Sequence, residues 1–131
     1  MPVTCNTEDA PTLVRYTFDG EWSATELAKL RQELIRAGQL TRKTCVLFDL
    51  RTATAFPTAK DLQLALYTAT ADHVWPACRA FLVNTPLQHD AARQLQALLG
   101  PESVINETFQ DESRAMEWLS AFAGKTHSIK A

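Results

Sequence analysis

The stretch from Phe48 to Gln63, FDLRTATAFPTAKDLQ, decides how this chain of 131 residues is organised. It starts at the end of an apolar run, which the carboxylate of Asp49 closes, and it ends where a helical spacing of apolar residues begins at Leu62. Three threonines lie between these two points: Thr52, Thr54 and Thr58. A buried strand that passes through a polar turn into a helix is the repeating unit of α/β domains.

The same alternation continues on both sides of this stretch. Helical apolar spacing with a start signal occurs four times, beginning near Ser23, Thr58, Thr85 and Asp111. Runs typical of strands lie between them, at 13–18, 44–50, 79–83 and 104–109, with a further candidate at 2–6. The order β-β-α-β-α-β-α-β-α predicts a single α/β domain at residues 1–123, with a mixed, largely parallel sheet of four or five strands and about four helices. Residues 124–131 are expected to form a flexible tail, and Gly38 is expected to end the first helix in a left-handed conformation.

Composition and charge limit the possible functions. Hydrophobic residues make up 46% of the chain and charged residues 21%, and the formal charge of −2 argues against a broad basic face for nucleic acid. No apolar segment approaches the length of a membrane-spanning helix, and the first residues lack the pattern of a secretion signal. Cys45 and Cys78 lie in apolar runs, which predicts buried free thiols. We therefore expect a cytoplasmic protein with no nucleic-acid partner and no stable membrane insertion.

The sequence shows no arrangement of residues that indicates catalysis or a metal. The three histidines lie in unrelated segments without partners at metal-ligand spacing: His73, His89 and His127. There is no phosphate-binding glycine loop, dinucleotide-binding loop or nucleophile elbow. A reaction that used Asp49 and the threonines would lack a base with a partner to orient it. The sequence thus predicts no enzyme and no cofactor.

Thr58 is the candidate for phosphorylation or anion binding. The start of a helix presents unpaired N–H groups and the positive end of the helix dipole, which stabilise an anion or a phosphorylated hydroxyl there. Arg51 and Lys60 add positive charge nearby. Thr58 followed by Asp61 also fits a plain helix cap, which stabilises a helix by about 1 kcal/mol without any function. The sequence leaves both interpretations open.

Asp49 stands at the carboxyl end of a predicted central strand, where open α/β sheets bind ligands. With Arg51 and Lys60, and with Thr52 and Thr54 between them, it is a candidate for a polar ligand crevice or an interaction surface. The alternative is that the Asp49 carboxylate accepts hydrogen bonds from loop N–H groups. Its position alone does not separate these two roles.

A second set of candidates is apolar and consists of Trp22, Phe56, Leu64, Tyr67 and Trp75. Trp22 and Phe56 lie in loops that follow predicted strands, where residues often line ligand crevices. The second helix, predicted over 58–71, carries Leu64 outside its main apolar stripe. Such a broad apolar face can cover a hydrophobic pocket, a partner surface or additional core.

Three segments resemble the STAS domain family, the anti-sigma-factor antagonists and their relatives. They are Phe18-Asp-Gly-Glu-Trp22, Cys45-Val-Leu-Phe-Asp-Leu50 and Phe109-Gln-Asp-Glu-Ser-Arg-Ala-Met-Glu-Trp-Leu119. The last is similar to the closing strand and helix of the sporulation-antagonist-like subgroup, which is related to the Sec14/CRAL-TRIO lipid-carrier lobe. The resemblance spans about residues 13 to 122. It implies a helix-flanked sheet and a non-catalytic regulatory module that binds a protein, such as a kinase or another signalling protein.

Regulatory members of that family carry Asp-Ser-Ser-Gly at the start of the helix after this strand, and a partner kinase phosphorylates the serine. Aligned without gaps, the motif falls on Pro57-Thr-Ala-Lys60, where the hydroxyl of Thr58 alone remains. The first expectation is therefore a protein-binding domain with phospho-regulation at Thr58. The alternative is a small carrier or sensor of a lipid or fatty acid, with the second helix as a lid. An edge strand or the second helix also offers a surface for a homodimer.

Overall fold

A computed structural model describes residues 2–68, 75–99 and 104–130, with side chains up to residue 122 except those of residues 67 and 68. In this part of the chain the order of elements is β-β-α-β-α-β-α-β-α, as the sequence predicts. The strands are β1 (Val3–Asn6), β2 (Leu13–Glu21), β3 (Cys45–Ala55), β4 (Cys78–Leu82) and β5 (Ile105–Phe109). The helices are α1 (Ala24–Arg36), α2 (Ala59–Thr68), α3 (Pro86–Leu98) and α4 (Glu112–Lys130).

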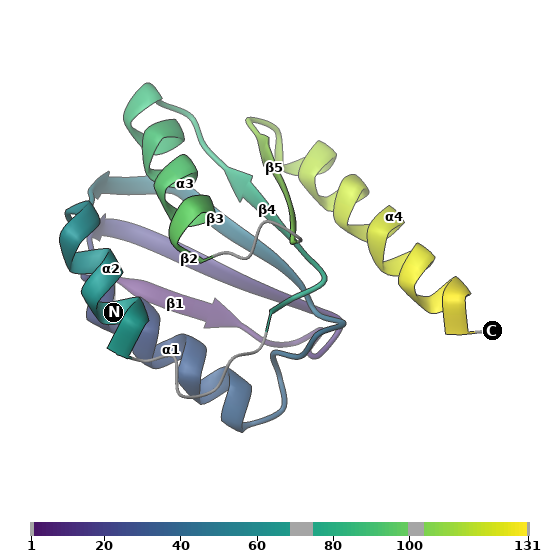
Figure 1. The fold of residues 1–131 in the computed structure, drawn as a ribbon. Helices are drawn as coiled ribbons and strands as arrows, with labels where there is room; N and C mark the ends of the chain where they lie inside the picture. Colours follow the sequence, from purple (N-terminus) through teal and green to yellow (C-terminus); the bar gives the residue numbers. More distant parts are fainter. Residues whose placement is uncertain (1, 69–74, 100–103, 131) are drawn as a thin grey trace.

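The strands form one mixed sheet in which the spatial order follows the sequence, from β1 to β5. β1 pairs with β2 in the antiparallel sense, and the other three pairs are parallel. Because each new parallel strand is added on the same side and the crossovers have the same hand, α1, α2 and α3 all lie on one face of the sheet. α4 lies on the other face, next to β3, β4 and β5 (Figure 1). These findings confirm the predicted α/β class.

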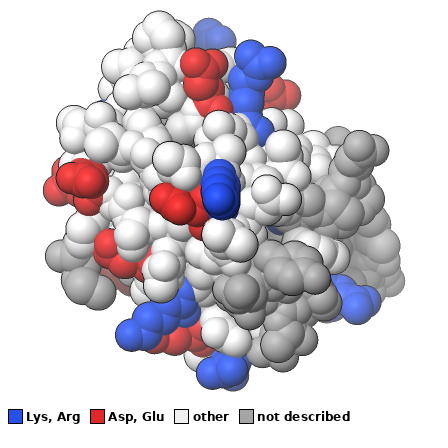
Figure 2. Space-filling model, turned by 60° about the vertical axis from the view of Figure 1, so that its left-hand side comes forward, with Lys and Arg blue, Asp and Glu red and all other residues white. Residues whose placement is uncertain are grey.

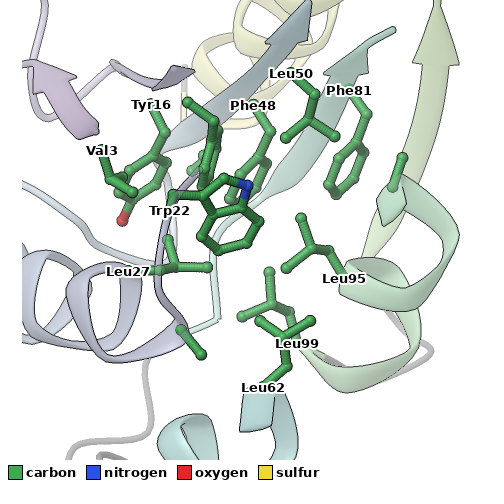
Figure 3. Close-up of a cluster of buried hydrophobic side chains, with 14 of the residues drawn as sticks. Val3, Tyr16, Trp22, Leu27, Phe48, Leu50, Leu62, Phe81, Leu95 and Leu99 are labelled. Atoms are coloured by element: carbon green, nitrogen blue, oxygen red, sulfur yellow. The ribbon is translucent and has the colours of Figure 1, made fainter. Parts of the chain in front are cut away.

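The main core lies between the sheet and the first three helices. Leu27, Leu62 and Leu95, one from each of these helices, point into a layer of aromatic side chains on the sheet (Figure 3). Phe48 and Phe81 are paired across β3 and β4, and their rings stack with centroids 4.7 Å apart. Such aromatic pairs contribute about 0.5–1.5 kcal/mol beyond their burial. The core therefore holds α2 against the sheet through its buried residues.

A smaller core lies on the opposite face, where Ala115 and Leu119 of α4 pack on Leu47 and Leu82. Cys45 and Cys78 belong to the same cluster and are partners in the β3–β4 register. Both thiols are free and buried, as predicted from their apolar surroundings. No helix in the described ranges combines the length and the apolar character needed to cross a bilayer.

Strands β2 and β3 are longer than their sequence patterns predict. Their parallel pairing continues to Glu21 and Ala55, with register shifts near Gly20, which has a φ of +59°. Thr52 and Thr54 are therefore strand residues and not part of the junction between β3 and α2. Between them Ala53 is buried while both threonines are exposed, which is the alternation of a strand with one face on the core.

The pairing between β3 and β4 ends at Asp49 of β3 and Leu82 of β4. The part of β3 after Asp49 therefore has no β4 neighbour. The side chain of Gln88, in the first turn of α3, forms hydrogen bonds with this part of β3 in place of a neighbouring strand. Its Nε2 donates to the carbonyl oxygens of Arg51 and Ala53, each at 3.1 Å. The side-chain oxygen of Gln88 accepts from the backbone of Asn84 at 2.7 Å. The start of α3 is thus tied to the outer part of β3.

The C-terminal ends of α1 and α4 can be compared with the ends predicted from the sequence. Gly38 has a φ of +73°, which confirms its left-handed position after α1. Helical backbone in α4 continues to Lys130 and includes Gly124, beyond the predicted end of the domain at residue 123. The domain boundary therefore stays a prediction. The predicted end of α2 at residue 71 lies outside the described residues.

Candidate functional site

A groove with a volume of about 600 Å³ lies between the first turn of α1 and the first two turns of α2. Trp22 directly follows β2 and Phe56 directly follows β3, and both side chains line it. The carboxyl ends of parallel strands are the usual place of ligand sites in α/β sheets. The full lining is Glu21, Trp22, Ser23, Ala24, Thr25, Phe56, Pro57, Thr58, Asp61, Leu64 and Ala65. We call it the α1/α2 groove.

The floor of the α1/α2 groove is aromatic. Trp22 is buried, with its ring centroid 4.7 Å from that of Phe18 and 6.3 Å from that of Phe56. The indole Nε1 of Trp22 is buried and has no hydrogen-bond partner in the part of the chain that the structure describes. A buried donor without a partner costs about 1–3 kcal/mol. This floor is therefore firmly packed yet carries an unused donor.

The rim of the groove contains the N-terminal caps of both helices. The hydroxyl of Ser23 accepts from the backbone N–H of Glu26 at 3.2 Å, and that of Thr58 accepts from the N–H of Asp61 at 3.1 Å. The helix-cap interpretation of Thr58 is therefore confirmed. Its side chain is exposed, so the cap does not hide it from a modifying enzyme or a partner. Phosphorylation at this position stays a prediction.

The charge of the groove is negative. Glu21 and Asp61 line it, and its described lining contains no lysine or arginine. Lys60 is exposed but does not belong to the lining. Figure 2, which brings forward the side of the molecule that carries α2 in Figure 1, shows separate acidic and basic residues among many uncharged ones, without a continuous basic patch. A free anion is thus less favoured here than Thr58 alone suggests.

The structure brings together some of the predicted residues and separates others. Trp22, Phe56, Thr58 and Leu64 share the α1/α2 groove, and Leu64 is 55% exposed. Trp75 lies outside its lining, with its ring 5.7 Å from the guanidinium carbon of Arg31. The side chain of Tyr67 lies outside the described residues.

The polar candidates after Asp49 are likewise divided. Thr52 donates its hydroxyl to the carbonyl oxygen of Phe18 at 2.8 Å, and Thr54 is exposed on β3. Neither lines the groove. Asp49 and Arg51 lie on the opposite face of the sheet from the α1/α2 groove, because Phe48 and Leu50 point into the main core.

Asp49 and Arg51 belong to a network of four charged side chains, which we call the arginine network. Oδ2 of Asp49 accepts from Nη2 of Arg15 at 2.7 Å and from Nη2 of Arg51 at 2.8 Å. Oδ1 of Asp49 accepts from Nε of Arg51 at 2.9 Å and from its backbone N–H at 3.1 Å. Oε1 of Glu112, in the first turn of α4, accepts from Arg15 at 3.1 Å and from Arg51 at 2.6 Å.

The network fixes the charge state of its carboxylates. Burial alone would raise the pKa of Asp49, but the hydrogen bonds from Arg51 and Arg15 outweigh it and lower that pKa to about 2. The pKa of Glu112 is lowered by its hydrogen bonds to Arg15 and Arg51. Both carboxylates are therefore ionised at neutral pH.

Sequence reasoning missed Arg15 and Glu112. In the structure Thr17 pairs with Asp49, and Arg15, two residues earlier on β2, shares its face of the sheet; this register is not contained in the sequence pattern. Glu112 could not be found either, since its place depends on how α4 packs across the sheet. The described residues contain no group of three or more His, Cys, Asp or Glu side chains that could hold a metal ion.

The sheet order, the parallel crossovers and the closing helix on the second face are those of a STAS-like fold. No family model and no curated protein matches the sequence. Among solved structures, the chain is similar to an uncharacterized protein from the DUF3478 family with a SpoIIAA-like fold, from Shewanella loihica PV-4. The similarity has a TM-score of 0.61 and covers 89% of this chain and 91% of that chain at 16% sequence identity. It confirms the SpoIIAA-like fold and carries no activity with it.

Proposed function

We propose that this chain is a non-catalytic STAS-like interaction module that binds a partner protein through the α1/α2 groove. The observation that carries the proposal is the convergence of Trp22, Phe56, Leu64 and Thr58 on one surface depression. Leu64 is an exposed large apolar side chain on α2, whereas Leu62 and Leu66 of the same helix are buried. An exposed apolar residue beside a groove with an aromatic floor is what a partner side chain can pack against.

The chemistry of the groove indicates the kind of partner. Glu21 and Asp61 give it negative charge, so a partner segment that combines an apolar side chain with a lysine or arginine fits it best. A phosphate on Thr58 would lie at the start of α2, where the helix N-terminus stabilises it, and would add charge within the groove. Phosphorylation would thus change the affinity for the partner without unfolding α2.

A capture experiment with matched variants tests this proposal. Immobilised wild-type protein and Leu64→Glu are compared with Leu87→Glu, which alters a leucine on α3 that is 57% exposed and outside the groove. The expected result is a partner that is retained by wild type and Leu87→Glu and lost by Leu64→Glu. Equal capture by all three proteins would contradict the proposal.

The same capture assay tests the phospho-regulation. Thr58→Ala removes the hydroxyl, and Thr58→Glu places a carboxylate at the start of α2. We expect Thr58→Glu to change partner retention and Thr58→Ala to abolish regulation by a kinase. Partner retention that is identical in wild type and both variants would remove Thr58 from the proposal.

A carrier of an apolar molecule is the second candidate, favoured by the apolar walls that Trp22, Phe56 and Leu64 give the groove. Beneath the helices, Leu62 and Leu66 of α2 are buried in the main core, and a cavity lined by Tyr16, among others, has a volume of about 10 Å³. That is room for about one water molecule. Native mass spectrometry of the purified protein decides, because a carrier retains a lipid or fatty acid.

A cytoplasmic location is part of the proposal and is supported by the three free cysteines, which suit a reducing compartment. Self-association through β1, which lies at one edge of the sheet, or through α2 stays a prediction. Light scattering at two protein concentrations measures it.

A further inference from the structure

We propose that Arg15 and Arg51 form a binding site for a phosphate-class oxyanion, and that the carboxylate of Glu112 fills this site in the structure described here. The site lies on the α4 face of the sheet, opposite the α1/α2 groove. It does not depend on the function proposed for that groove.

Asp49 positions the guanidiniums of Arg15 and Arg51 by hydrogen bonds from the sheet. The Asp49 side chain is 8% exposed, and its two oxygens together accept from both arginines at 2.7 to 2.9 Å. Arg51 is held by two parallel contacts, which fixes the plane of its guanidinium. Asp49 therefore holds the guanidinium of Arg51 by two contacts and that of Arg15 by one, independently of Glu112.

The contacts that Glu112 makes with the two arginines are those of a bound oxyanion. A single oxygen, Oε1 of Glu112, accepts from Nη2 of Arg15 at 3.1 Å and from Nη2 of Arg51 at 2.6 Å. Two guanidiniums that converge on one oxygen provide the contacts that phosphate and carboxylate groups receive in protein sites. Glu112 thus shows where the oxygen of a ligand would lie.

Glu112 can be replaced more easily than Asp49. Its side chain is 43% exposed, and those of Arg15 and Arg51 are 28% and 29% exposed, so solvent reaches the contact. Exposed ion pairs are weak, and a competing anion can displace one. Without Glu112, two arginines face a single buried aspartate and the site has a net charge of +1. A phosphate dianion gains more from this charge than the single charge of a carboxylate does.

Binding of an anion would release the side chain of Glu112 from Arg15 and Arg51. The helix α4 would stay in place, because Ala115 and Leu119 are buried in the smaller core. The site therefore couples the presence of an oxyanion to the position of Glu112 without dismantling the fold.

Titration with inorganic phosphate at constant ionic strength and pH 7, followed by NMR chemical shifts, tests the proposal. Glu112→Gln removes the internal competitor, and Glu117→Gln removes the same charge from an exposed position on the same helix. We expect Glu112→Gln to bind phosphate about three- to tenfold more tightly than wild type, and Glu117→Gln to bind it like wild type. Equal affinity in the two variants, or no binding by Glu112→Gln, would overturn the proposal.

Two double variants show whether the arginines are responsible. Adding Arg15→Gln or Arg51→Gln to Glu112→Gln is expected to abolish the gain in phosphate affinity, while Asp49 still binds the arginine that remains. A gain that persists in either folded double variant would place the phosphate elsewhere. Acetate serves as a monoanionic probe, and affinity for acetate equal to that for phosphate would overturn the assignment of a phosphate-class ligand.

Discussion

The guanidinium of Arg51 forms two parallel hydrogen bonds with the carboxylate of Asp49, two residues earlier on the same face of β3. Arg15 reaches the same carboxylate from the neighbouring strand β2. Asp49 thus contacts two positive charges at a point where it is itself 5% exposed. Removal of one partner from a buried ion pair is costly because the remaining charge loses its compensation.

Asp49→Asn is therefore expected to lower the free energy of unfolding by roughly 2–4 kcal/mol. The amide of asparagine cannot neutralise Arg15 and Arg51, and its NH₂ group faces their donors. Denaturation by urea measures the change. Asp90→Asn, at an exposed position of α3, is the control and is expected to change stability by less than about 0.5 kcal/mol.

The stability should also depend on pH through Asp49. Its pKa in the folded protein is about 2, below the ordinary value of 3.8, so its contribution is fully present above about pH 4 and is lost as the pH falls toward 2. This contribution amounts to about 2 kcal/mol. The difference in free energy of unfolding between wild type and Asp49→Asn should shrink by that amount between pH 5 and pH 2. A difference that stays constant over this range would contradict the ion pairing.

The cap at the start of α2 gives a third prediction. Thr58→Ala removes the acceptor of the Asp61 N–H and should destabilise the protein by about 1 kcal/mol. Thr58→Ser retains the acceptor and should remain within a few tenths of a kcal/mol of wild type. Thermal unfolding of the two variants separates this structural role from any effect of Thr58 on partner binding. Equal stability of the two variants would contradict the cap.

Gln88→Leu should destabilise the protein by roughly 2–3 kcal/mol. The substitution leaves the carbonyl oxygens of Arg51 and Ala53 without the donor that they have now, at a position where Gln88 is 4% exposed. Gln94→Leu, at an exposed position of the same helix, is the control. If both variants unfold at the same urea concentration, the amide of Gln88 does not support the sheet.

Thiol labelling gives a fifth prediction. Cys45 and Cys78 are buried, whereas Cys5 is half-buried on β1, so one of the three thiols should react in the folded protein and all three after denaturation. The pKa of Cys5 is raised, first by burial and then by Glu33, so its labelling should be slow and should accelerate with pH. Counting thiols with a chromogenic disulfide reagent measures this. Cys5→Ser should show no reactive thiol in the folded state.

The element order could be predicted because its signals are local. The capping residues Ser23 and Thr85 mark helix starts, and the continuous apolar run from Cys45 to Phe48 marks a strand covered on both faces. The outer part of β3 was missed although the alternation of threonine and alanine from Thr52 to Ala55 is itself a strand pattern. Its polar composition resembled a turn, and pairing with β2 decided the outcome.

The candidate sites were less predictable because they depend on packing between distant segments. The proximity of Trp22 to Phe56 follows from strand order, since each comes directly after one of two neighbouring parallel strands. The hydrogen bond between Arg15 and Asp49 depends on the register of β2 against β3. The contact of Glu112 with Arg15 depends on the placement of α4. A sequence pattern that is local to the junction after Asp49 contains neither.

The overhang of β2 and β3 beyond the end of β4 has a mechanical consequence. Two-stranded ribbons twist more freely than wide sheets, so this overhang is the part of the sheet that can change its torsion while the stacked rings of Phe48 and Phe81 stay fixed. Trp22 and Phe56 sit at its tip, and Gln88 fastens its flank to the start of α3. A change of twist at the tip is therefore expected to be transmitted to α3 through the two hydrogen bonds of Gln88.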